Sequence, residues 1–204
     1  PGAKILIQAS PKMTGTIGGG CVEGDVYLYA QKMLESRQVK PQIQEYQLNE
    51  DIAMHDGLVC GGTMQLWIEP VLTPHPFLPL AQQIQNAYEG GPSVVMATVI
   101  KSGASLLPVG TRLLVREDRT LVGSLGRDEA NEQAKKELLA LTKDGETDYI
   151  TLPDGTELFA ENFSTPPLLV VMGGGHVGKA VSSLAATLDF QIHIVDDRTE
   201  FANP

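Results

Sequence analysis

The sequence is poor in cysteine and histidine, and it has fewer basic than acidic residues. Its 204 residues include two cysteines, Cys21 and Cys60, four histidines, and 15 Lys and Arg against 25 Asp and Glu, for a formal net charge of -10. Lys and Arg supply most of the affinity for nucleic acids and anionic membranes, so this charge argues against both partners. Two cysteines without a Cys-x-x-Cys pair or histidines at ligand spacing argue against structural zinc.

Long apolar runs and a secretion signal are also absent from the sequence. No apolar stretch approaches the roughly 20 residues that span a bilayer, and no charged-then-apolar segment stands at the N-terminus. The two cysteines suit a reducing cytosol, so the expected location is cytoplasmic, although they could instead pair as a disulfide. A charged fraction of 20% and a hydrophobic fraction of 42% are those of an ordinary folded protein.

A glycine-rich turn stands near the C-terminus, between an apolar run and a stretch with helical periodicity. Residues 173–178 read Gly-Gly-Gly-His-Val-Gly, so Gly173, Gly175 and Gly178 fill the positions of G-x-G-x-x-G. In a dinucleotide-binding turn these glycines permit the tight turn, the close approach of a pyrophosphate, and the packing of helix on strand. We therefore predict a nucleotide site, with His176 directed toward a bound phosphate or a domain interface.

The residues after this turn fit the same interpretation. Apolar positions recur at helical spacing, and residues 191–195 form a predicted strand that ends in Asp196-Asp197. An acid about 20 residues past the glycines commonly binds a ribose hydroxyl, so Asp196 is predicted to do so and to favour NAD over NADP. We expect residues 163–204 to be the start of a truncated Rossmann-like domain. The positions at helical spacing are Val177, Val181, Leu184 and Leu188.

The preceding part of the chain repeats itself at a separation of 108 positions. Gly2 to Ile7 matches Gly110 to Val115, and Gly15 to Gly18 matches Gly123 to Gly126. We predict one α/β domain over residues 1–162, built from two related halves at about 1–72 and 93–162. A predicted helix follows each glycine loop, with apolar residues at Val26, Ala30, Met33 and Leu34 in the first copy and at Ala130, Ala134, Leu138 and Leu141 in the second.

A strand predicted over Val94 to Ile100, followed by a turn through Ser102-Gly103, precedes the second copy. Its counterpart in the first copy would have to stand before Pro1. We therefore expect the protein to continue before Pro1.

The two glycine loops differ in chemistry. In the second loop, Asp128 is expected to cap its own helix. Three glycines in the first loop leave the N–H groups of the helix start open to an anion, and a cysteine there would gain thiolate character. Alternatively, the glycines only fit a tight turn, the cysteine is a small buried residue, and the glutamate stays solvated instead of bonding to the loop. The residues concerned are Gly18, Gly19, Gly20, Cys21 and Glu23.

The second cysteine stands directly before two glycines, in Cys60-Gly61-Gly62. Because nothing bulky follows it, its sulfur and the adjacent amides could approach a ligand or another sulfur closely. The alternative is a structural residue that ends a strand before a bulge.

Three motifs in this order make the chain resemble the XdhC/CoxI family. They are Gly-Thr-Ile-Gly-Gly-Gly-Cys-Val-Glu at Gly15 to Glu23, Cys60-Gly61-Gly62, and Gly-Gly-Gly-His-Val-Gly at Gly173 to Gly178. The family consists of accessory proteins for xanthine dehydrogenase, carbon monoxide dehydrogenase and related molybdenum hydroxylases. The resemblance runs from about Pro1 to Asn203 and implies an N-terminal α/β domain followed by a Rossmann-like domain.

This resemblance implies a protein that binds the molybdenum cofactor (molybdopterin), shields it while a cysteine desulfurase adds the terminal sulfido ligand, and inserts it into the apo-hydroxylase. Carried over by motif, Cys60 contacts the molybdenum or its incoming sulfur, Gly18 to Gly20 hold the pterin phosphate, and Glu23 supports that loop. A thiolate is a suitable soft partner for molybdenum or sulfur. Whether the protein forms a homodimer is left open.

A non-enzymatic maturation chaperone is therefore the preferred interpretation. The alternative is an NAD(P)-dependent oxidoreductase with an α/β substrate domain, which would need an acid-base residue near the nicotinamide that the sequence does not clearly offer. A third interpretation is an interaction protein that keeps an empty nucleotide fold.

Overall fold

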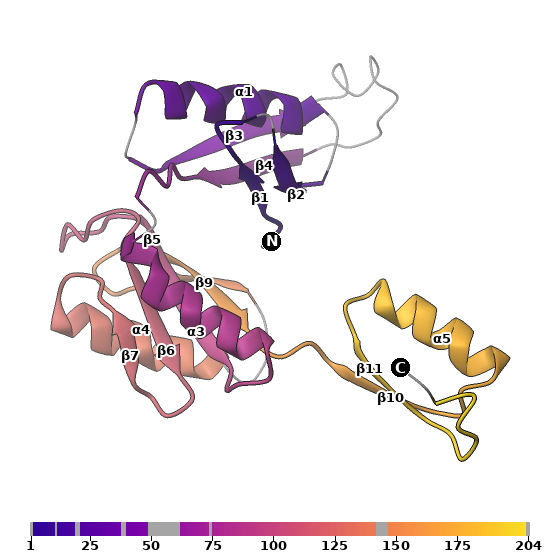
Figure 1. Cartoon of the computed structure of the whole chain (residues 1–204). Helices are drawn as coiled ribbons and strands as arrows, with labels where there is room; N and C mark the ends of the chain where they lie inside the picture. The colour runs from indigo at the N-terminus through magenta and orange to yellow at the C-terminus, as the bar shows by residue number, and fades with distance from the viewer. Residues whose placement is uncertain are drawn as a thin grey trace.

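The computed structural model describes residues 2–10, 12–18, 21–37, 40–48, 62–73, 75–141 and 147–202. It confirms the predicted α/β class, because helices and sheets alternate along the chain (Figure 1). None of the helices in these ranges has the length and apolar character needed to cross a membrane.

The second half of the N-terminal region is a complete sheet with a helix on its face. Its strands lie in the order β7-β6-β5-β9-β8, and each neighbouring pair is antiparallel. The elements are β5 (Val94–Lys101), β6 (Arg112–Arg116), β7 (Leu121–Gly123), α4 (Asp128–Leu141), β8 (Asp148–Thr151) and β9 (Glu157–Phe163).

The central strand β5 is buried on both faces. Val95, Ala97 and Val99 pack with α4 in the main core. Val94 and Met96 belong to a second cluster with the helix α3 (Leu78–Tyr88), which follows the short 3₁₀ helix η1 (His75–Phe77). Burial on both faces explains why β5 reads as a continuous apolar run instead of an alternating one.

The first half contains the same kinds of element, but its strands form two separate sheets. β1 pairs only with β2 and β3 only with β4 among the described residues, both antiparallel. Figure 1 shows α1 lying over β3 and β4, with β1 and β2 beside them. The elements are β1 (Ile5–Ile7), β2 (Met13–Gly15), α1 (Cys21–Glu35), β3 (Gln42–Leu48) and β4 (Gly62–Ile68).

The separation of 108 positions also relates the strand registers of the halves. Ile5 pairs with Gly15 in the first half, and Leu113 pairs with Gly123 in the second. The predicted helix faces are inward in both copies, since Val26 and Met33 of α1 and Ala134 and Leu138 of α4 are buried.

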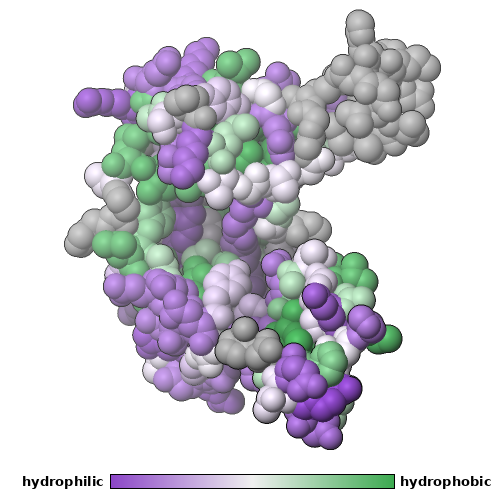
Figure 2. Space-filling model, turned by 45° about the vertical axis from the view of Figure 1, so that its right-hand side comes forward, coloured by the Kyte–Doolittle hydropathy of each residue, from purple (hydrophilic) through white to green (hydrophobic). Residues whose placement is uncertain are grey.

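The C-terminal unit is a parallel strand-helix-strand arrangement. β10 (Leu168–Met172) pairs in parallel with β11 (Gln191–Val195), and α5 (His176–Ala186) connects them. The helix agrees with the predicted periodicity, yet its buried positions are the small residues Gly178, Ser182 and Ala185. The large apolar residues of this stretch are exposed, and Figure 2 shows green apolar residues on the surface of this unit at the lower right. Exposed fractions are 78% for Val177, 42% for Val181, and 68% for Leu184 and Leu188.

Candidate functional site

The first glycine loop is held in place by the side chain of Glu23. Its Oε1 accepts hydrogen bonds from the Thr16 hydroxyl, at 2.6 Å, and from the Ile17 N–H, at 3.0 Å. The Gly18 N–H in turn donates to Thr16 Oγ1 at 3.2 Å. Of the two interpretations of Glu23, the structure therefore shows the one in which it bonds back to the loop.

The second loop has the same frame with a different acceptor. Asn131 Oδ1 accepts from the Leu125 N–H at 2.8 Å, and the Gly126 N–H donates to Ser124 Oγ at 3.0 Å. Each residue of this frame lies 108 positions after its counterpart, so Asn131 replaces Glu23. The expected cap by Asp128 is wrong: Asp128 is exposed and makes no side-chain hydrogen bond to any described residue, because α4 already begins at Asp128 and a capping residue has to precede the first turn.

The two loops differ in what surrounds Gly18 and its counterpart Gly126. Gly18 and Gly126 both have a positive φ, +118° and +104°. A side-chain carbon built on Gly126 would lie 3.7 Å from Pro108 Cδ, whereas one built on Gly18 would have no described atom within 4 Å. In the part of the chain that the structure describes, nothing covers the first loop at Gly18, whereas the turn between β5 and β6 covers the second loop at Gly126.

Only part of the predicted cofactor site lies in the described residues. α1 begins at Cys21, of which only the backbone is described, and β4 begins at Gly62 with φ +128°. The start of α1 and the start of β4 lie at the same end of the first half (Figure 1). Gly19, Gly20, Cys60 and Gly61 lie outside the described residues.

The glycine turn of the C-terminal unit has distinct roles for its glycines. Gly173 follows β10 with φ +106°, and Gly175 is the N-cap of α5. A side-chain carbon on Gly178 would meet Gly173 O at 1.9 Å, so Gly178 allows α5 to lie against the turn. Such a carbon on Gly173 or Gly175 would meet nothing within 4 Å, which leaves both positions open to a ligand.

Asp196 lies at this turn, but its carboxylate is already engaged. It accepts hydrogen bonds from the Gly174 N–H at 2.8 Å and from the Arg198 guanidinium, with both Nε and Nη2 at 2.9 Å. These bonds, first those from Arg198, hold the pKa of the Asp196 carboxyl well below its usual range. Arg198 also stacks over the ring of Phe201, 4.2 Å from its centroid. The Asp196 carboxylate can bind a ribose hydroxyl only if at least one of its hydrogen bonds from the Arg198 guanidinium is broken.

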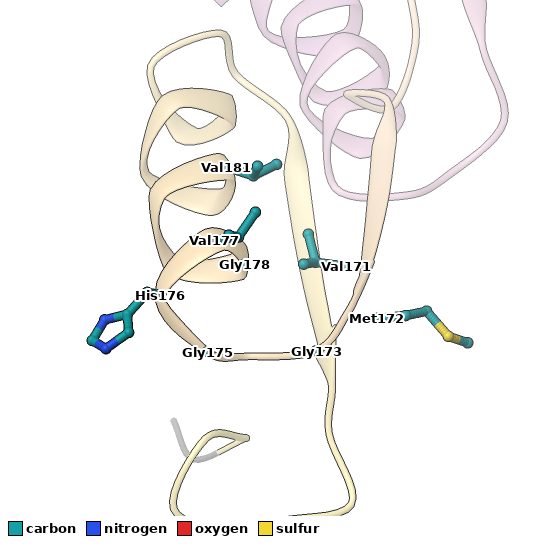
Figure 3. Close-up of a pocket in the computed structure, with 8 residues that line it drawn as sticks. All are labelled: Val171, Met172, Gly173, Gly175, His176, Val177, Gly178 and Val181. Carbon is teal, nitrogen blue, oxygen red and sulfur yellow. The ribbon is translucent and has the colours of Figure 1, made fainter.

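His176 is exposed, and Figure 3 shows its ring directed away from β10 and β11. Val171, Val177 and Val181 meet across the hollow beside the turn (Figure 3). A ligand in this hollow would therefore contact backbone atoms and apolar side chains.

The sequence did not predict the two ion pairs that join the halves. Lys4 pairs with Glu161 of β9, and Arg112 of β6 pairs with Glu69 just after β4. Lys4 and Arg112 are 108 positions apart, so each half contributes the equivalent cation to a carboxylate of the other. The sequence offered one signal, namely a basic residue at the same position of both copies. The glutamates that pair with these two residues are too distant in the sequence to be predicted as partners.

A protein-family model described as the XdhC and CoxI family matches residues 1–47 and 87–152. The chain is also similar to a solved structure from Bacillus halodurans described as a xanthine dehydrogenase, with 20% sequence identity and a TM-score of 0.67. That match covers 98% of this chain and 54% of the other, so the chain spans about half the length of that protein. At this identity the likeness establishes the fold. No match was found among curated proteins.

Proposed function

Because the chain belongs to the XdhC and CoxI family, we propose that it is an accessory protein for a molybdenum hydroxylase of the xanthine dehydrogenase type. In this role it binds the molybdenum cofactor, protects it while the terminal sulfido ligand is added, and delivers it to the apo-enzyme. The proposed partners are that apo-enzyme and a cysteine desulfurase. Binding and handover need no acid-base residue, in contrast to a dehydrogenase reaction.

The observation that carries this proposal is the difference between the two glycine loops. They share one hydrogen-bonded frame, but among the described residues no atom lies within 4 Å of a side-chain carbon built on Gly18, whereas Pro108 Cδ lies 3.7 Å from one built on Gly126. The first loop also leads directly into α1, a helix of 15 residues whose first N–H groups and positive dipole end favour an anion. The phosphate of a pterin cofactor fits such a loop, since backbone N–H groups can hold it without side-chain cations.

The metal end of the cofactor would need a soft ligand. Among the described residues, no group of three or more His, Cys, Asp and Glu side chains is arranged to hold a metal ion. We assign this contact to Cys60, because a thiolate suits both molybdenum and sulfur. When bound, the cofactor would supply the molybdenum centre of the target hydroxylase, and this chain would hold its phosphate and its metal end.

Replacing each cysteine by serine tests the proposal, because serine removes the thiolate with little change in volume. The protein is loaded with molybdenum cofactor under anoxic conditions and separated from free cofactor, and bound molybdenum and pterin are measured. We expect Cys60→Ser to lower retention by about tenfold or more, and Cys21→Ser, the matched control, to have a smaller effect. Normal retention and normal maturation of the hydroxylase by Cys60→Ser would show that Cys60 is structural.

A second proposal is that the turn at Gly173 to Gly178 binds a dinucleotide. The open positions at Gly173 and Gly175 and the start of α5 favour a pyrophosphate there. A ribose hydroxyl would bind Asp196 in place of part of its contact with Arg198.

Removing Arg198 tests this second proposal. In Arg198→Ala the carboxylate of Asp196 keeps its bond from the Gly174 N–H but is free to accept from a ribose, so NAD affinity should rise by a few-fold. Asp196→Ala should weaken NAD binding. Calorimetry on the intact protein measures both. An absence of heat for NAD, NADP and a pterin dinucleotide in all three proteins would leave the turn as a folding element.

A further inference from the structure

A cleft of about 490 Å³ lies between the free edges of β1 and β4. The side chains of Val26, Ala30 and Met33 on α1 line one wall. Met96 and Thr98 of β5 in the second half line the opposite wall. Neither β1 nor β4 pairs with any described strand on the side that faces this cleft. The cleft thus has two unpaired strand edges as its sides and apolar side chains above and below.

The second half has a strand at the equivalent place. There β5 lies between β6 and β9 and pairs antiparallel with both. β1 corresponds to β6 at the separation of 108 positions, and β4 corresponds to β9 at a separation of 92, where Gln-Leu-Trp-Ile-Glu at 65–69 matches Glu-Leu-Phe-Ala-Glu at 157–161. The order β2-β1-cleft-β4-β3 therefore matches β7-β6-β5-β9-β8.

The two ion pairs between the halves support this correspondence independently. A shift of 108 positions converts Lys4 into Arg112, and a shift of 92 converts Glu69 into Glu161. In each ion pair, the cation of one half therefore pairs with the carboxylate of the other half, and the two pairs consist of equivalent residues. This exchange is what the equivalence of β1 with β6 and of β4 with β9 predicts.

The residues that flank β5 are more deeply buried than the residues that flank the cleft. Leu113 and Leu158, which flank β5, are 0% exposed. Their counterparts Ile5 and Leu66, which flank the cleft, are partly exposed. An apolar lining of this kind beside two unpaired edges is the usual arrangement for the addition of a strand.

We propose that the cleft is a strand-addition site for an extended apolar segment that runs antiparallel to both β1 and β4. The occupant is the part of the same polypeptide that leads into Gly2, as β5 leads into Gly110 through the turn at 102–109. Gly2 and Gly110 have the same φ of +92°, which gives the chain the same direction as it enters β1 and β6.

The register of the added strand follows from that of β5. Ala97 lies between Leu113 and Ala160. The equivalent residue of the occupant lies between Ile5 and Ile68 and faces α1. Because both faces are covered, the occupant is a continuous β-branched and apolar run without internal proline.

This strand also changes the glycine loop, in a part of the inference that rests on the proposed function. In the second half the turn after β5 places Pro108 against Gly126. The turn between β8 and β9 holds the turn after β5 through two hydrogen bonds, one from the Gly103 N–H to Thr156 Oγ1 and one from the Ser105 N–H to Asp154 Oδ2. The equivalent turn in the first half would lie beside Gly18. It would complete the wall of the cofactor site.

An extension of the chain tests the strand. A copy of residues 93–109 replaces Pro1, so that the copied β5 precedes Gly2 at the spacing found in the second half. Matched controls carry the same extension with proline in place of the copied Ala97, or with its residues in scrambled order. Hydrogen exchange is measured for peptides covering β1 and β4, with β6 and β9 as internal references.

We expect the extension to slow exchange of β1 and β4 by at least about tenfold and to raise the melting temperature, while both controls leave them unchanged. The synthetic peptide with the sequence of residues 93–101, added in trans to the original chain, should protect the same strands in a saturable way. Equal exchange with and without the extension and the peptide would overturn the proposal. Concentration-dependent protection of the original chain, with dimers, would overturn it in favour of a second copy.

Cofactor retention is scored separately in the same proteins. Protected strands with raised retention support both the strand and its turn beside the cofactor site. Protected strands in a protein that binds no cofactor would establish the strand-addition site and count against the proposed function.

Discussion

The two halves of the N-terminal region share the same strand pairings and loop hydrogen bonds, but only the second half has a central strand among the described residues. In the second half a central strand fills the sheet, a turn covers the glycine loop, and the core residues are fully buried. In the first half the strands are split by a cleft, and the glycine loop is open at Gly18. The second half thus serves as a reference for the first half, because it shows the sheet and the loop with the central strand in place.

The strongest test of this contrast is a matched pair of core substitutions. Leu113→Ala removes a fully buried side chain between two paired strands and should cost about 3 kcal/mol of unfolding free energy. Its counterpart Ile5→Ala lies beside the cleft and is already partly exposed, so it should cost about 1 kcal/mol. Urea unfolding of the whole chain measures both. An equal loss of unfolding free energy in the two variants would contradict the tighter packing of the second half.

The second test compares the two acceptors that hold the loops. Asn131→Ala leaves the buried Leu125 N–H without a partner and should cost about 2 kcal/mol. Glu23→Ala removes the acceptor of the Ile17 N–H in a more exposed loop and should cost about 1 kcal/mol. Thermal unfolding reports stability, and cofactor retention reports the loop. We expect retention to fall in Glu23→Ala and to be normal in Asn131→Ala.

Glu23→Gln refines this comparison because glutamine keeps an acceptor for both bonds but has no charge. Restored retention would assign Glu23 a positioning role through the loop. A continued loss would assign the effect to its charge instead.

The third test adds an acid to the open loop. Gly19→Asp places a carboxylate at the start of α1, where it competes with a ligand phosphate while costing the helix little. We expect cofactor retention to fall by about tenfold with almost unchanged melting. Arg127→Asp, at the matching position of the second loop, is the control and should leave retention normal. Lower melting with normal retention in Gly19→Asp would show that Gly19 serves only the backbone conformation.

Much of this arrangement was accessible from sequence because it depends on local patterns. The α/β class, the glycine turn and the separation of 108 follow from glycine spacing and periodicity. The partners of Lys4 and Arg112 did not, since they depend on how two halves pack. The inward face of α5 was not predicted either, because periodicity marks the large apolar residues, whereas the buried positions are the small residues Gly178, Ser182 and Ala185.

The smallest expected effect concerns the turn that closes the second half. Asp154 accepts hydrogen bonds from the Thr156 N–H at 3.0 Å and from the Ser105 N–H at 3.2 Å. These bonds, first the one from the Thr156 backbone, lower the pKa of the Asp154 carboxyl to about 2. The pKa in the unfolded chain is about 3.9, so the stabilisation is complete above that pH and is lost as the pH falls through about 2.

Because Asp154 is partly exposed, this contribution should stay below about 1 kcal/mol. Asp154→Asn isolates it, since every other carboxyl titrates equally in both proteins. Hydrogen exchange of the turn from Gly103 to Leu106 should be slower in the original protein than in Asp154→Asn at pH 5, and the difference should disappear by about pH 2. Equal exchange of the two proteins at pH 5 would mean that the turn is held by packing of Leu107 in the core and not by the charge of Asp154.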